Sequence, residues 1–272
     1  MTVIDASAFV GAYPFRDLGS TGSASWLVEQ MNRLHIDRAW VGYLPAVFHR
    51  DPAPGNQALE LIAAPWADRL LPVPTVNPEQ PRWQDDLNRA LEHGAPAVRV
   101  FPQYQGVDPA GDEMRVLLAA TAVAAIPLVL TVRLEDARQR HPLDMAPELP
   151  AAAVRALVRS DAQARVLVTH ADAAYVQEVH FGLTEREAAQ LLWDITWLWG
   201  PPEDHLGRLI HTIGHERFTL GTAMPLRVGD VAMARLDLLD VPDETRRALL
   251  GGNLRDWAGQ VLETESSGDP AG

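Results

Sequence analysis

Apolar runs of strand length alternate along the chain with segments of helical periodicity. Most of these runs are continuously apolar rather than strictly alternating, which is typical of parallel strands covered on both faces. Eight such runs occur in 272 residues, or about 34 residues per unit, close to the size of one strand with its crossover helix. The runs lie at residues 3–10, 38–44, 69–76, 95–101, 126–134, 164–170, 191–199 and 217–222.

The intervening segments carry helix-start signals. Ser23 or Ser25 is placed to cap a helix that follows, and Thr184 with Glu187 forms a capping box. Eight alternations of strand and helix favour a closed (β/α)8 TIM barrel, an α/β fold, over a doubly wound sheet. We therefore predict a single barrel domain over residues 1–262, followed by a short, polar, disordered tail at 263–272.

Composition narrows the classes of partner. The formal net charge is −13, from 23 Lys and Arg against 36 Asp and Glu, which argues against nucleic acid and anionic membranes as partners. No apolar run reaches the roughly 20 residues of a membrane span, and the first residues lack the pattern of a secretion signal. The chain has no cysteine, which excludes disulfides and thiolate metal sites. We expect a cytoplasmic protein that acts on small molecules.

Polar residues at the ends of the predicted strands are the candidates for chemistry, because TIM-barrel active sites lie at the carboxyl ends of the strands. Those that carry the argument are Asp5, Ser7, Arg16, Arg99, Tyr104, Arg133, Glu135, His170, Asp194 and Thr222.

Arg99 and Arg133 lie inside apolar strands, where a charge is costly to bury unless it has a partner. Strand alternation places Arg99 on one face with Ala97 and Phe101. Two interpretations stay open for these arginines. Each forms a structural ion pair (for Arg133 with Glu135, Asp136 or Asp194), or the two bind a carboxylate or phosphate of the substrate.

His170 ends an apolar strand. An imidazole there is a structural hydrogen bonder, a general acid or base, or a metal ligand. The sequence contains no dinucleotide-binding glycine motif, no phosphate-binding loop, no serine-hydrolase elbow and no H-E-x-x-H metal motif.

Several loose motifs, in order along the chain, suggest a family. They are VIDASAFVG on the first predicted strand, RLLPVPTVNP on the third, RVLVTHAD on the sixth, FTLGTAMPL on the eighth and LLGGNLRDWAG in the closing helix. With these motifs the chain resembles the amidohydrolase-related (amidohydrolase 2) branch of the metal-dependent hydrolases of TIM-barrel fold. That branch includes enzymes like aminocarboxymuconate semialdehyde decarboxylase and like 2-pyrone-4,6-dicarboxylate lactonase.

The resemblance also shows where this chain departs from the family. The two histidines of the family's first strand fall on Ser7 and Phe9, and the aspartate of its eighth strand falls on Ala223. Its strand 5 ligand falls near Thr131 or Arg133, so only His170 keeps a ligand-type side chain. A catalytic zinc site needs about three protein ligands. We therefore expect no metal and no other cofactor.

Three functional hypotheses follow. The first is a metal-independent hydrolase or lyase, like a decarboxylase or lactonase, that acts on a small carboxylated substrate. Its catalytic candidates are His170, Asp194 and Glu135, and its substrate-binding candidates are Arg99, Arg133, Arg16, Tyr104, Asp5 and Thr222.

The second hypothesis is a non-catalytic barrel that binds a ligand or a partner protein. The third is a metal-dependent amidohydrolase, which would require the strand alignment to be shifted by a residue or two. By analogy with barrel hydrolases, we expect a homodimer.

Overall fold

The computed structural model describes residues 2–199 and 204–259. The predicted tail, residues 263–272, and the predicted domain boundary after residue 262 lie outside these residues and stay predictions. Within the described part, no helix combines the length and the apolar character needed to cross a bilayer.

Each of the eight apolar runs contains a strand. The strands are β1 (Ile4–Val10), β2 (Arg38–Tyr43), β3 (Leu70–Pro72), β4 (Val98–Val100), β5 (Leu128–Thr131), β6 (Val166–Thr169), β7 (Leu191–Asp194) and β8 (Phe218–Thr219). The paired strands are parallel throughout, in the order β1-β2-β3 and β4-β5-β6-β7-β8. The prediction of a parallel α/β architecture is confirmed.

Backbone hydrogen bonds join the two sheet segments into a ring. After β3, a parallel bridge links Thr75 with Arg99 of β4. On the other side, the amide of Ala6 donates to the carbonyl of Leu220 at 2.9 Å, and the amide of Ala223 donates to the carbonyl of Ser7. Both sides of β1 are therefore paired, so the sheet is a closed (β/α)8 barrel.

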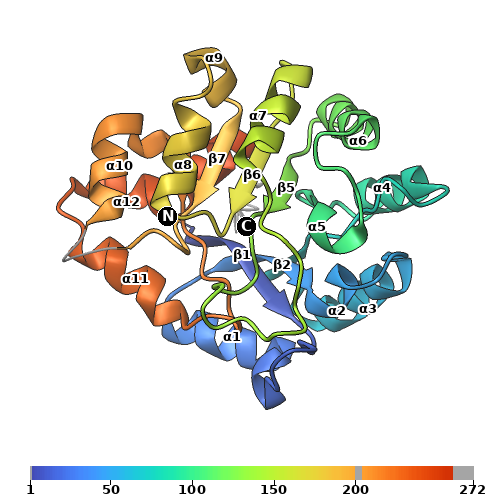
Figure 1. Cartoon of the computed structure of the whole chain (residues 1–272). Coiled ribbons are helices and arrows are strands. Elements are labelled where there is room, and N and C mark those ends of the chain that lie inside the picture. The colour runs from blue at the N-terminus through green and yellow to red at the C-terminus, as the bar shows by residue number, and fades with distance from the viewer. Residues whose placement is uncertain (1, 200–203, 260–272) are drawn as a thin grey trace, which may run out of the picture.

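Helices surround this barrel, with the strands at the centre (Figure 1). They are α1 (Ala24–Arg33), α2 (Leu44–Val47), α3 (Ala53–Ala63), α4 (Trp83–Glu92), α5 (Pro102–Gln105), α6 (Asp112–Val123), α7 (Ala151–Ser160), α8 (Ala173–His180), α9 (Glu185–Ala188), α10 (His205–Ile213), α11 (Gly229–Leu238), α12 (Asp243–Arg247) and α13 (Asn253–Ala258), with short turns η1 (Gly19–Gly22), η2 (Ala64–Trp66), η3 (His215–Arg217) and η4 (Ala248–Gly252). Ser23 caps α1, and Thr184 and Glu187 form the expected capping box at α9.

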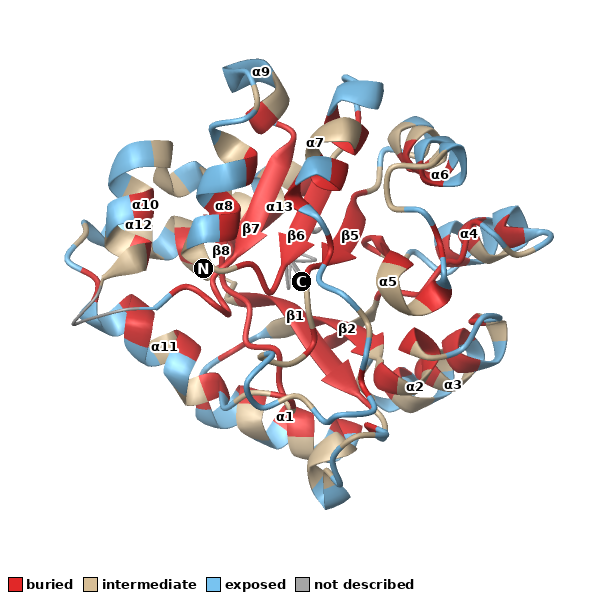
Figure 2. Ribbon diagram, viewed as in Figure 1, coloured by how far each residue is buried: buried red, intermediate tan, exposed pale blue. Residues whose placement is uncertain are grey.

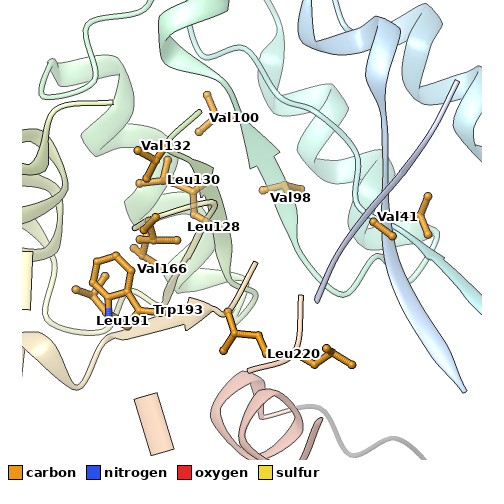
Figure 3. Packing of buried hydrophobic residues seen from close by; sticks show 14 of the residues in the cluster. Val41, Val98, Val100, Leu128, Leu130, Val132, Val166, Leu191, Trp193 and Leu220 are labelled. Carbon is orange, nitrogen blue, oxygen red and sulfur yellow. The ribbon is translucent and has the colours of Figure 1, made fainter. Parts of the chain in front are cut away.

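The strands are buried on both faces (Figure 2). Their outward side chains, among them Val98, Leu128, Val166 and Trp193, form one cluster with the inner faces of the helices (Figure 3). This double burial explains why the strands appear in the sequence as continuous apolar runs.

The inward side chains form two layers, two residues apart on the same strands. The apolar layer includes Trp40, Ala97, Val129, Leu167 and Leu192, and it packs against α13 through Leu254 and Ala258. The polar layer consists of Arg99, Thr131, Thr169 and Asp194, all completely buried, with Gly42 on β2. Because side chains alternate along a strand, residues two apart face the same side, and the polar layer lies toward the carboxyl ends.

Candidate functional site

The carboxyl end of the barrel is covered by a long segment, residues 132–150, between β5 and α7. It runs in front of β1 in the view of Figure 1. Its base is held by ion pairs of Arg133 with Glu148 and with Asp172, at 3.1 and 2.9 Å. Its middle stacks His141 on Phe15 of the loop after β1, with ring centroids 5.7 Å apart. We call this segment the mouth loop.

A pocket of about 210 Å³ lies beside the mouth loop, at the ends of β7, β8 and β1. Among its lining residues are Arg16, Glu135, Thr196, Thr222, Arg227 and Arg235. The Glu135 carboxylate lies 3.1 Å from the Arg16 guanidinium. Burial raises the pKa of Glu135, although the nearby Arg16 and Arg227 oppose that rise. Three guanidinium groups against one carboxylate make this pocket suited to an anion.

Two of these arginines, Arg227 and Arg235, were not among the sequence candidates. The Arg227 guanidinium lies 3.6 Å from the centroid of the Trp197 ring, and Arg133 lies over the same ring at 5.4 Å. Arg235 of α11 donates to the carbonyls of Ile195 and Thr196. It therefore ties α11 to the end of β7 while it lines the pocket. The sequence held no clear signal for either arginine, because α11 also carries Asp230 and Asp237 and has the composition of an ordinary surface helix.

Asp5 and Thr222 together hold the seam between β1 and β8. One carboxylate oxygen of Asp5 accepts the amides of Ser7 and Thr222, both at 3.0 Å, and the other accepts the Thr222 hydroxyl. Burial raises the pKa of Asp5, and these hydrogen bonds partly offset the rise. Thr222 also lines the pocket. Asp5 thus positions the pocket wall, and its oxygens are already used by the protein.

His170 lies in the polar interior with both ring nitrogens engaged. Nδ1 is 2.8 Å from the backbone carbonyl oxygen of Arg133, and Nε2 is 3.2 Å from the Ser7 hydroxyl. Burial, together with repulsion from Arg99, Arg227 and Arg133, lowers the pKa of His170 to about 3, although the hydrogen bond to the Arg133 carbonyl opposes the fall. Its backbone is in the left-handed region, with φ of 61°, a costly conformation that is often found at functional sites.

Asp194 does not orient the His170 ring. Its Oδ1 accepts the backbone amide of His170 at 2.9 Å, and its Oδ2 accepts the Thr196 hydroxyl at 2.7 Å. Burial raises the pKa of Asp194 to about 6. The carboxylate therefore fixes the backbone turn at the end of β6, and the imidazole is oriented by a carbonyl instead.

Arg99 is completely buried, and within residues 2–199 and 204–259 none of its three guanidinium nitrogens has a hydrogen-bond partner. The guanidinium lies 4.6 Å from the centroid of Phe9 and 5.9 Å from that of Phe101. Burial lowers the pKa of Arg99 to about 10, while Asp194 and Asp5 favour its charged form. It is therefore a buried cation with unused donors, the most costly kind of group to leave without a ligand.

Two further sequence candidates lie outside the pocket. Arg133 forms ion pairs, as its structural interpretation expects, but with Glu148 and Asp172 rather than with Glu135, Asp136 or Asp194. The Tyr104 hydroxyl donates to Asp144 at 3.1 Å, and its ring packs against Phe48. Both residues hold the mouth loop. The mouth loop approaches the barrel only through tertiary contacts, so sequence spacing could not have revealed these partners.

No protein-family model matches this sequence, and no curated protein matches it. Solved structures do. A dihydroxybenzoic acid decarboxylase from Polaromonas sp., with manganese and 2-nitroresorcinol bound, aligns at 12% identity with a TM-score of 0.74, covering 95% of this chain and 97% of that one. The chain has the fold of that protein.

Two more barrels align over most of the chain. One is a probable 2-pyrone-4,6-dicarboxylic acid hydrolase from Acinetobacter baumannii with citric acid bound, at 12% identity, a TM-score of 0.66 and coverage of 96% and 100%. The other is an uncharacterized TIM-barrel protein from Bordetella bronchiseptica, at 15% identity, a TM-score of 0.70 and coverage of 96% and 100%. The predicted TIM barrel is confirmed.

The manganese of the Polaromonas decarboxylase raises the question of whether this barrel holds a metal. Its residues do not fit one. Phe9 places a ring 5.9 Å from the His170 ring, and the Arg99 cation lies over the same phenyl group. Within residues 2–199 and 204–259, no group of three or more His, Asp or Glu side chains is arranged to hold a metal ion. A guanidinium and an aromatic ring occupy the region between β1, β4 and β6.

Proposed function

We propose that this barrel is a metal-independent hydrolase or lyase whose substrate is a small molecule with at least one carboxylate. The observation that carries the proposal is the pocket at the ends of β7, β8 and β1, which is lined by Arg16, Arg227 and Arg235. Guanidinium groups bind carboxylates through paired, charge-assisted hydrogen bonds.

The roles of the side chains follow from their positions. Arg16 and Arg227 bind the substrate carboxylate. The Thr222 hydroxyl does not, because its proton is donated to Asp5. Arg99 offers free donors deeper in the barrel. His170 is the acid or base, because its Nε2 faces the interior and its Nδ1 is fixed by a carbonyl. Glu135 already pairs with Arg16, so a bound carboxylate competes with Glu135 for that guanidinium. Asp194 positions the His170 backbone.

The structural neighbours are consistent with this substrate class. The Polaromonas protein is named for a benzoic acid and the Acinetobacter protein for a pyrone dicarboxylic acid, and the latter structure contains citric acid. Both names specify carboxylic acids.

Binding of a dicarboxylate tests the proposal first. Isophthalate should raise the Tm of the wild-type protein, and Arg227→Met should weaken isophthalate binding at least tenfold, because it removes one guanidinium from the pocket. Isophthalamide has the same shape without charge and should give no shift. Arg33→Ala is the matched control, since Arg33 pairs with Asp230 on the exposed surface. Equal isophthalate affinity in both variants would contradict the proposal.

Turnover is the second test. Esters, lactones and aromatic acids are screened with wild-type protein that has been treated with a chelator. His170→Asn should lower turnover of any substrate at least 10²-fold, as is typical for loss of a general acid or base. Activity that requires an added divalent metal would overturn the metal-independent reaction.

A second candidate function is ligand binding without turnover. It is favoured by one observation: Ser7, His170 and Asp194 are all completely buried, and none of them lines the pocket. Isophthalate binding with no turnover of any screened ester, lactone or acid would support it. Cytoplasmic location and a homodimeric state remain proposals from the sequence, and size-exclusion chromatography with light scattering tests the latter.

A further inference from the structure

Ser7 and His170 form a pair that the sequence motifs did not reveal, because Ser7 stands where the family resemblance expects a histidine. Ser7 lies on β1, and His170 directly follows β6. The Ser7 hydroxyl oxygen is 3.2 Å from Nε2 of His170, and both residues are completely buried. A nucleophile within hydrogen-bond distance of a base, with the base fixed by a third group, is the arrangement of nucleophilic catalysis.

The direction of this hydrogen bond is fixed by the other side of the ring. The carbonyl of Arg133, 2.8 Å from Nδ1, can only accept, so Nδ1 carries the proton. In the neutral imidazole Nε2 is then an acceptor, and the Ser7 hydroxyl donates to it. The serine proton already points at the base that would remove it.

Arg99 supplies donors to the same interior. Its three guanidinium nitrogens have no acceptor among the described residues. The guanidinium lies over the Phe9 ring, and that ring lies 5.9 Å from the His170 ring. Arg99 therefore places a buried cation close enough to oppose a positive charge on His170. Such a fixed, buried charge stabilises an oxyanion more strongly than a solvated one does.

We propose that Ser7 is the nucleophile of an acyl-transfer reaction, with His170 as its base, on an ester or lactone that carries a second, free carboxylate. This inference rests on the proposed function and selects its hydrolytic form. Ser7 Oγ bonds to the carbonyl carbon while its proton passes to Nε2 of His170. The C–O bond to the leaving group then breaks, and His170 returns the proton to the leaving oxygen. Water next attacks the acyl-serine, giving its proton to His170, which passes it to Ser7 Oγ as the acid departs.

The substrate's free carboxylate makes His170 a stronger base. Arg99, Arg227 and Arg133 all oppose a positive charge on His170. A carboxylate bound to the pocket arginines neutralises part of that repulsion, so proton transfer from Ser7 becomes easier only when such a substrate is present. The pocket is adjacent to the pair, since the Ser7 carbonyl accepts the amide of Ala223, which follows the pocket residue Thr222.

Two para-nitrophenyl esters test the inference. The glutaric acid monoester carries the free carboxylate, and the pentanoic acid ester is its neutral analogue. With wild-type protein, the glutarate ester should release a burst of one equivalent of nitrophenolate, at least 10²-fold faster than the neutral ester. After an acid quench, mass spectrometry should find the acyl group on Ser7.

Variants make the result specific. Ser7→Ala should abolish both the burst and the adduct, while Ser25→Ala, an exposed serine on α1, should leave both unchanged. Ser7→Cys replaces only the nucleophilic atom, and its thioester adduct is assignable because the chain has no other cysteine. An adduct on another residue, an unchanged burst in Ser7→Ala, or equal rates for the two esters would overturn the inference.

Isophthalate binding separates this inference from the proposed function. Ser7→Ala should still bind isophthalate with the wild-type Tm shift, which also shows that the variant is folded. Isophthalate binding and chelator-resistant turnover in wild-type protein, without an adduct on Ser7, would overturn the nucleophile and leave the proposed function standing. Absence of both isophthalate binding and turnover would overturn the proposed function itself.

Discussion

The two layers inside the barrel differ in chemistry although they lie two residues apart on the same strands. In the apolar layer, Leu167 and Leu192 meet other hydrocarbon side chains. One step toward the carboxyl ends, Thr169 and Asp194 take their places, both completely buried. The apolar layer stabilises the fold by hydrophobic burial alone and needs no hydrogen-bond partners. The polar layer requires a hydrogen-bond partner for every buried group.

A truncation in the apolar layer should have the largest effect on stability. Leu167→Ala should lower the free energy of unfolding by about 3–5 kcal/mol, because the closed barrel cannot collapse around the cavity. Urea denaturation measures this loss. Leu61→Ala is the control, since that leucine is 76% exposed on α3. A similar loss in both variants would mean that the apolar layer is not rigidly packed.

Asp194→Asn should change how stability depends on pH. Burial raises the pKa of Asp194 to about 6 in the folded chain, above the unfolded value near 3.9. Asp194 therefore favours folding fully below about pH 4, and this contribution disappears as the pH rises through 6. Across this window the wild type should lose up to about 3 kcal/mol relative to Asp194→Asn.

Urea denaturation of both proteins at several pH values measures that difference. His170 affects the free energy of unfolding in the opposite direction, because its pKa is lowered to about 3 in the folded chain. Its contribution to stability is present at neutral pH and is lost as the pH falls. That effect is common to both proteins and cancels in their difference. Parallel stability curves for the two proteins would contradict a raised pKa at Asp194.

A smaller effect should come from the Thr131 and Thr169 hydroxyls, which are hydrogen-bonded to each other at 2.9 Å. Thr131→Val or Thr169→Val alone should cost about 1–2 kcal/mol, since each leaves a buried hydroxyl without that partner. The double variant should cost less than the sum of the two. A double-mutant cycle in urea measures the coupling. Strictly additive losses would show that the two hydroxyls do not depend on each other.

The sequence predicted the apolar layer better than the polar one. Continuous apolar runs located all eight strands, and alternation correctly placed Arg99 on one face with Ala97, inside the barrel. The same alternation could not show which side chains of other strands lie against the Arg99 guanidinium. The Phe9 ring beneath it belongs to another strand, and its approach depends on how the barrel closes.

The site was harder to predict because its partners are distant in sequence. Arg16, Glu135 and Thr222 were expected at the mouth, and all three line the pocket. Arg227 and Arg235 were missed, since an arginine in or near a surface helix resembles an ordinary solvated charge. Ser7 was interpreted as a lost metal ligand, and only its distance to His170 suggests a different use.

The ion pairs of the mouth loop should make both the rates of ligand entry and exit and the affinity for a ligand depend on salt concentration. It is held partly by ion pairs of Arg133 with Glu148 and of Arg16 with Glu135, and in each pair one side chain is well exposed. Added salt screens such pairs, since the Debye length falls from about 10 Å at 0.1 M to about 3 Å at 1 M. Entry and exit should then become faster as the loop opens more often, while the affinity for a carboxylate falls. Under the proposed function, a high-salt buffer should therefore speed the exchange of a bound carboxylate and weaken its affinity.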